Sequence, residues 1–152
     1  MKKRNLITLL TGAALLAMAA VSPTFADEVK EVEAGARGGR LLDTESPRPE
    51  FFVEKDHTVS VKFYDKEGNA VAPVDQQVTV IATGGEKKKL ALVKKDDALV
   101  STEPLPEGDG YGLVVQVRPD AKSRPANFRF DFLNHICGGT CGNPEYACTC
   151  DE

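Results

Sequence analysis

Between Phe51 and Leu133 the chain is a succession of short apolar stretches that alternate with polar residues and are separated by turns. In Val59–Phe63 and in Tyr111–Val117 every second residue is a large apolar one. A period of two puts the apolar side chains on one face of a β-strand. No stretch has a helical period long enough for a crossover helix, so the sequence predicts an all-β domain.

The spacing of these stretches favours one particular architecture. Roughly seven short strands are expected, separated by turn-forming residues such as those at 65–69, 84–85 and 96–97. This spacing is typical of an immunoglobulin-like β-sandwich, in which two sheets bury their apolar faces against each other. Without tryptophan, the core is expected to consist of valine, leucine and phenylalanine. The predicted β-sandwich domain covers residues 38–133.

The N-terminal residues predict export. Lys2, Lys3 and Arg4 precede an apolar stretch at 6–21, and Thr24-Phe25-Ala26 has the small-x-small form of a cleavage site. This arrangement is typical of a secretory signal peptide over residues 1–26, and the apolar stretch is too short for a membrane anchor. We therefore predict a periplasmic or secreted protein. Residues 27–37 are polar or small with no core pattern, and are expected to form a flexible linker.

Removal of the signal peptide would make the chain more acidic. The remaining 126 residues contain 16 basic and 23 acidic residues, enough chain for one modest domain and not two. A net charge of −7 argues against nucleic acid and against an anionic membrane surface as partners. Only two histidines, His57 and His135, are present in the whole chain. Two histidines without a supporting motif do not make a hydrolase, and we expect no catalytic centre.

All four cysteines lie in the C-terminal tail, residues 134–152. Cys137, Cys141, Cys148 and Cys150 are spaced Cys-x3-Cys-x6-Cys-x-Cys, and His135 precedes them. Glycines and a proline between the cysteines allow the backbone to curl around an ion. This Cys-rich tail is the candidate functional site.

A soft metal ion is the first interpretation of the tail. Four thiolates, or three with His135, fit a tetrahedral zinc site, and thiolates also suit copper(I). The sequence does not separate these two ions. The tail contains no lysine or arginine, so metal binding itself would have to drive deprotonation of the thiols. The predicted partners are accordingly a metal ion and a protein of the cell envelope.

Disulfide bonds are the alternative. An exported chain with an even number of cysteines is commonly a disulfide protein, and two bonds would stabilise the tail by about 2–4 kcal/mol each. A Cys148–Cys150 bond closes a strained ring, so Cys137 and Cys141 are expected to pair crosswise with Cys148 and Cys150. The protein would then be a structural or interaction module. A third interpretation is a thiol redox sensor that uses Cys148 and Cys150.

Three motifs carry a resemblance to known proteins. They are Gly38-Gly39-Arg40-Leu41-Leu42, the turn Asp65-Lys-Glu-Gly after a Val-x-Val-x-Phe strand, and the tail Glu145-Tyr-Ala-Cys148-Thr-Cys150. Together they resemble small exported bacterial β-sandwich proteins of unassigned function. More distantly, the Gly-Gly-x-Leu opening is similar to YtkA-like domains and to the periplasmic segment of heavy-metal efflux adaptors. That resemblance implies metal handling at the cell envelope.

Overall fold

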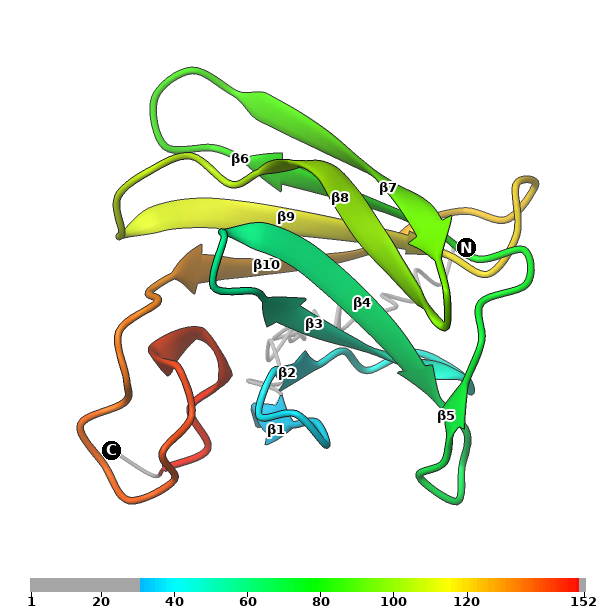
Figure 1. Ribbon diagram of the computed structural model, residues 1–152, viewed down its shortest axis with the longest axis horizontal. Coiled ribbons are helices and arrows are strands. Elements are labelled where there is room, and N and C mark those ends of the chain that lie inside the picture. The colour runs from blue at the N-terminus through cyan, green and yellow to red at the C-terminus, as the bar shows by residue number, and fades with distance from the viewer. Residues whose placement is uncertain (1–30, 151–152) are drawn as a thin grey trace, which may run out of the picture.

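The computed structural model describes residues 31–150. The predicted signal peptide at 1–26 lies outside the described residues. The described chain is all-β, as predicted, and its antiparallel strands form one strongly curled sheet with the shape of a half-barrel (Figure 1). One short 3-10 helix, η1 (Glu145–Ala147), lies in the C-terminal segment. No described helix is long and apolar enough to cross a membrane.

Ten strands make up the sheet in the described residues. They are β1 (Glu33–Ala34), β2 (Arg40–Leu41), β3 (Arg48–Val53), β4 (Thr58–Tyr64), β5 (Ala70–Val71), β6 (Gln77–Ala82), β7 (Lys88–Lys95), β8 (Ala98–Pro104), β9 (Tyr111–Arg118) and β10 (Ala126–Phe132). Their order in the sheet is β1-β2-β3-β4-β8-β7-β6-β9-β10, and β5 pairs with β4. The seven longer strands overlap the apolar stretches of the sequence.

The expected sandwich of about seven strands is not confirmed, because strand β7 joins the described strands into one curled sheet. The first half of β7, residues 88–91, pairs with β6, whereas residues 92–95 pair with β8. The two halves of the domain therefore share a strand and form one continuous sheet that bends at β7. The additional strands β1, β2 and β5 have two residues each, too few for an alternating pattern to reveal.

Residues 31–37 are the described part of the predicted linker at 27–37, and they contact the sheet. Glu33 and Ala34 pair with β2, and Arg48 forms an ion pair with Glu33 at 2.6 Å. Arg37 lies over the ring of Phe52, with its guanidinium carbon 4.8 Å from the ring centroid. These contacts are mainly polar, so the low apolar content of the segment does not predict them.

The core lies inside the curl of the sheet. Strand β9 shows the predicted alternation directly, because Tyr111, Leu113, Val115 and Val117 are buried and the residues between them are half-buried. The rings of Phe51 in β3 and Phe130 in β10 meet edge to face at 5.4 Å. These two strands are far apart in the order of the sheet, so their side chains close the half-barrel without backbone hydrogen bonds.

A buried carboxylate connects the N-terminal segment to this core. Glu50 in β3 is fully buried, and one of its oxygens accepts hydrogen bonds from the backbone N–H groups of Arg37 (2.8 Å) and Gly39 (3.0 Å). Its other oxygen accepts from Arg37 Nε (3.2 Å) and from the Tyr64 hydroxyl (2.8 Å). Arg37 Nη1 also donates to Ser60 Oγ at 2.8 Å. The buried charge is thus both paired and hydrogen-bonded, as burial requires.

This network predicts a loss of stability at alkaline pH. Burial, followed by the hydrogen bond to Glu50, raises the pKa of Tyr64 to about 12, from an ordinary value of about 10. Because the folded protein holds the neutral phenol more tightly, its contribution is complete below pH 10 and is lost as the pH rises through about 12. We expect Tyr64→Phe to be less stable than wild type at pH 8, with the difference shrinking between pH 10 and 12. Urea denaturation across this range measures it, and a constant difference would contradict the prediction.

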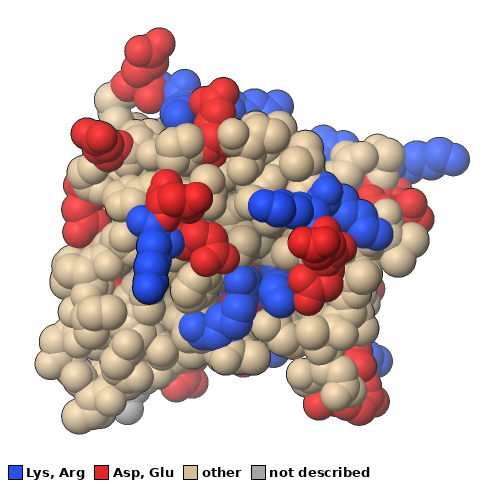
Figure 2. Space-filling view, viewed as in Figure 1, with Lys and Arg blue, Asp and Glu red and all other residues tan. Residues whose placement is uncertain are grey.

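Charged side chains of both signs are mixed on the face of the sheet that carries β4 and β8 (Figure 2). A shallow groove there is lined by Lys62, Asp97, Arg37 and Glu54 among others. Lys62 pairs with Asp97 at 2.9 Å, and Arg37 pairs with Glu54 at 3.4 Å. Since the charges in the groove neutralise each other in pairs, the groove has no clear preference for an anion or a cation.

Candidate metal centre

The C-terminal segment folds back on itself directly after β10. Ile136 and Pro144 form an antiparallel bridge, the Cys137 N–H donates to the Asn143 carbonyl at 2.9 Å, and the Glu145 N–H donates to the His135 carbonyl at 2.9 Å. Three glycines lie between Cys137 and Asn143, and Gly142 has a φ of +69° that few other residues adopt. The segment therefore forms a narrow loop, with Cys137 on the arm that enters it and Cys148 on the arm that leaves it.

Tyr146 fixes this loop to the sheet. Its side chain is 2% exposed, its ring stacks on Phe132 at 5.8 Å, and it meets Phe51 edge to face at 5.6 Å. The Val53 N–H donates to its hydroxyl oxygen at 3.1 Å, and Arg40 Nη1 donates to its carbonyl at 3.2 Å. In Figure 1 the segment covers one end of the half-barrel, beside the ends of β3 and β10. The tail expected from the sequence is thus part of the core at Tyr146.

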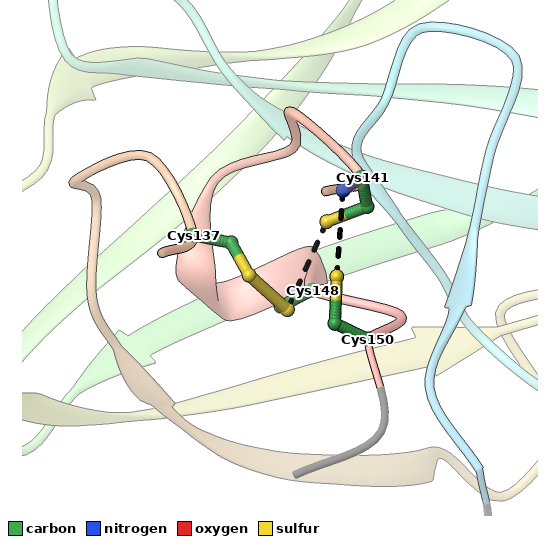
Figure 3. A group of neighbouring side chains, drawn as sticks. All are labelled: Cys137, Cys141, Cys148 and Cys150. Atoms are coloured by element: carbon green, nitrogen blue, oxygen red, sulfur yellow. Dashed lines mark hydrogen bonds between the residues drawn. A yellow bond between two sulfur atoms is a disulfide. The ribbon is translucent and has the colours of Figure 1, made fainter. Parts of the chain in front are cut away.

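The structure brings the four predicted cysteines together. The sulfur atoms of Cys137, Cys141, Cys148 and Cys150 all lie within 4.8 Å of one another, and Figure 3 shows the side chains converging on one point. Cys137 is buried at 7% exposure, whereas the other three are half-buried. The four sulfurs are therefore close enough to hold one metal ion.

One of the sulfur–sulfur distances agrees with tetrahedral coordination. Zn–S bonds of about 2.3 Å place the sulfurs of a ZnS4 centre about 3.8 Å apart. The sulfurs of Cys141 and Cys148 are 3.8 Å apart. Backbone N–H groups also point at the cluster: Gly139 donates to the Cys137 sulfur and Cys141 donates to the Cys150 sulfur, each at 3.4 Å. Such donors stabilise negative charge on a thiolate.

The electrostatics of the site come from the backbone. Hydrogen bonds from the backbone N–H of Thr149, and then of Asn143, lower the pKa of the Cys141 thiol. No lysine or arginine occurs between residues 134 and 150. In Figure 2 the lower left of the molecule, where this segment lies in Figure 1, is almost free of charged side chains. A cation bound by several thiolates would supply the positive charge that the protein lacks here.

His135 does not join the sulfur cluster. Its ring nitrogen Nδ1 lies 3.2 Å from Asp109 Oδ2, and the group of four potential ligands within 4.8 Å consists of cysteines alone. Asp109 also accepts a hydrogen bond from the backbone N–H of Asn134 at 2.9 Å. His135 is thus held beside the loop before β9, and would have to leave Asp109 to replace a thiolate.

One pair of cysteines is joined in the structure. Cys137 and Cys148 form a disulfide, with their Cα atoms 5.9 Å apart. Cys141 and Cys150 are free thiols. This bond is one of the crosswise pairings expected from the sequence. While it is present, Cys148 cannot take part in the Cys148/Cys150 pair that the redox-sensor interpretation requires.

Gly139 is one of the glycines expected to let the tail curl, and the structure gives it a packing role that the sequence does not indicate. A Cβ atom at this position would lie 2.5 Å from the Cys150 sulfur and 3.5 Å from the Cys137 sulfur. At Gly138, one residue earlier, a Cβ atom would meet nothing within 4 Å. The two glycines are equivalent as judged from the sequence. Only the packing in the structure shows that a side chain would fit at one position and not at the other.

This contrast gives a prediction with a matched control. We expect Gly139→Ala to weaken zinc binding by the reduced protein about 10–100-fold, because the methyl group displaces the Cys150 sulfur. Gly138→Ala should bind zinc as wild type does. Competition against a chromophoric zinc chelator measures both variants. Equal affinity of the two variants would contradict the packing of Cys150 against Gly139.

Comparison with known proteins adds nothing to this geometry. No family model matches the chain, and no curated protein and no solved structure is significantly similar to it. The resemblance to exported β-sandwich proteins and to YtkA-like or efflux-adaptor domains therefore stays a prediction.

Proposed function

We propose that the protein is an exported metal-binding accessory protein that uses its C-terminal thiolate cluster to hold zinc or copper(I). The ligands are Cys137, Cys141, Cys148 and Cys150, and His135 can substitute when one thiol is displaced. The observation that carries the proposal is the convergence of four sulfur atoms within 4.8 Å. The N–H groups directed at two of these sulfurs support it further.

A binding role without catalysis fits this ligand set. Catalytic zinc sites keep one coordination position open for water or substrate, whereas structural and storage sites are closed by four protein ligands. Four cysteine sulfurs would complete the tetrahedral shell of zinc. The partners in this proposal are a metal ion and, at the periplasm or outside the cell, a protein of the envelope that exchanges it.

The test starts from protein purified anaerobically from the exported fraction and kept reduced. Native mass spectrometry with thiol counting should find one ion per chain, with its four thiols protected from alkylation. Cys148→Ser should lose tight metal binding while the sheet stays folded, because three thiolates remain and His135 would have to leave Asp109 to become the fourth ligand. His135→Ala is the control and should keep it, since four sulfurs remain. Stoichiometric tight binding by Cys148→Ser would place the site elsewhere.

A second candidate function has one observation in its favour. The Cys137–Cys148 bond joins the two arms of the C-terminal loop, as expected of a structural or interaction module with a disulfide-stapled tail. In that case the exported protein would lack four protected thiols and would hold no metal in any redox state. The redox-sensor alternative instead requires a reversible change in the Cys148 and Cys150 thiols when the protein is oxidised and reduced.

A further inference from the structure

The four cysteines fall into two pairs that differ in how the backbone holds them. Cys137 and Cys148 are joined to each other, and each also has a backbone hydrogen bond: Cys137 to Asn143 at 2.9 Å and Cys148 to Glu145 at 3.0 Å. Cys148 directly follows Ala147, which is fully buried. This pair therefore forms the anchored side of the cluster.

Cys141 and Cys150 form the other pair, and both are free thiols. The backbone N–H of Cys141 points at the Cys150 sulfur at 3.4 Å, as Figure 3 shows, and the two sulfurs lie within 4.8 Å of each other. Both residues are half-buried, and the neighbouring residues 138–140 are exposed. An incoming ion can thus reach the two thiols without breaking the disulfide.

We propose that, with the Cys137–Cys148 disulfide in place, Cys141 and Cys150 form a two-thiolate site for a soft monovalent ion of the copper(I) class. This inference rests on the proposed function and assigns an ion to one redox state of the same tail. Zinc completes a tetrahedral shell of four ligands, whereas copper(I) is stable with few soft sulfur ligands. Two metal–sulfur bonds in line, each about as long as the 2.3 Å of zinc, span about 4.6 Å. The two sulfurs lie no more than 4.8 Å apart, close enough for both to bind one ion.

The binding step involves no change of oxidation state. Each thiol releases its proton to solvent, the two thiolates bind the ion, and the disulfide stays oxidised. The resulting complex carries one net negative charge. The N–H of Cys141, directed at the Cys150 sulfur, stabilises that charge. The redox state of the anchored pair then selects the metal: the reduced tail accepts zinc or copper(I), and the disulfide form accepts copper(I) alone.

Two double variants separate the pairs. Cys141→Ser/Cys150→Ser keeps the disulfide, and Cys137→Ser/Cys148→Ser keeps the two free thiols. Copper(I) is titrated against a chromophoric copper(I) chelator under nitrogen, with ascorbate as reductant and with the wild-type disulfide mapped before and after. Disulfide-containing wild type and Cys137→Ser/Cys148→Ser should each bind one copper(I). Cys141→Ser/Cys150→Ser should bind it at least 100-fold more weakly, and none of the three should bind zinc tightly.

A measurement on the wild-type protein tests the inference even if one of the variants fails to fold. Alkylation of Cys141 and Cys150 in the disulfide form should abolish copper(I) binding. Tight zinc binding by the disulfide form would overturn the inference, as would a second disulfide between Cys141 and Cys150 in the purified protein. If the reduced four-thiol protein binds metal and the disulfide form does not bind copper(I), this inference fails and the proposed function stands. If the reduced protein binds neither ion, the proposed function itself fails.

Discussion

Replacing Tyr146 with alanine should lower the free energy of unfolding by about 3–5 kcal/mol, the range for loss of a large buried aromatic side chain. The ring contacts Phe51 and Phe132, and its hydroxyl accepts the hydrogen bond of the Val53 N–H. A folded domain has only about 5–15 kcal/mol in total. This one residue of the tail therefore contributes a large part of the stability of the sheet, and its loss should also weaken metal binding by releasing the loop.

Urea denaturation followed by circular dichroism measures this effect. Ile136→Ala is the matched control in the same loop: its side chain is 62% exposed, so the change should stay within about 0.5 kcal/mol. Tyr146→Phe should fall between them, at about 1–3 kcal/mol, because the ring remains and the buried Val53 N–H loses its acceptor. If Tyr146→Ala unfolds at the same urea concentration as Ile136→Ala, the tail does not belong to the core.

Replacing Glu50 with alanine should have an effect of similar size. The change removes a fully buried carboxylate that accepts four hydrogen bonds, and it leaves the charged Arg37 without this partner. Breaking a buried ion pair by removing one member costs about 3–5 kcal/mol. The 35–39 segment, held by Arg37 and Gly39, should also detach from β3 and exchange its amide hydrogens faster.

Glu54→Ala is the control for Glu50. Its side chain is 42% exposed and also pairs with Arg37, at 3.4 Å. An exposed ion pair contributes about 0–1 kcal/mol, so Glu54→Ala should unfold almost as wild type does. Thermal unfolding and hydrogen exchange on both variants distinguish the two positions. Similar losses from Glu50→Ala and Glu54→Ala would show that the charge of Arg37, and not the buried network, is what matters.

Prediction from sequence succeeded where the information is local. The alternation in β9 requires only neighbouring residues, and it predicts the buried face from Tyr111 to Val117 that the structure confirms. The turns at Gly68 and Gly85 have φ values of +83° and +91°, as their glycines allow. The four cysteines lie close in sequence, so their convergence was also predictable.

Prediction failed where contacts between residues far apart in the chain determine which side chains are buried. Tyr146 is the single aromatic residue between residues 134 and 150, which was the only signal that the tail could join the core. Its partner Val53 lies 93 residues earlier in the chain. The burial of Glu50 had no signal at all, because a glutamate next to two phenylalanines is equally compatible with an exposed strand position.

Sequence alone is enough to predict the all-β class, the positions of the longer strands and the set of cysteines that meet, because each of these follows from residues near one another in the chain. The tertiary structure is needed to show that the strands form one curled sheet, since that depends on β7 pairing with a different neighbour along each half. It also decided which two cysteines are bonded and which two remain free. Sulfur positions depend on how Tyr146 and the glycine loop pack against the sheet, and spacing along the chain does not encode that packing.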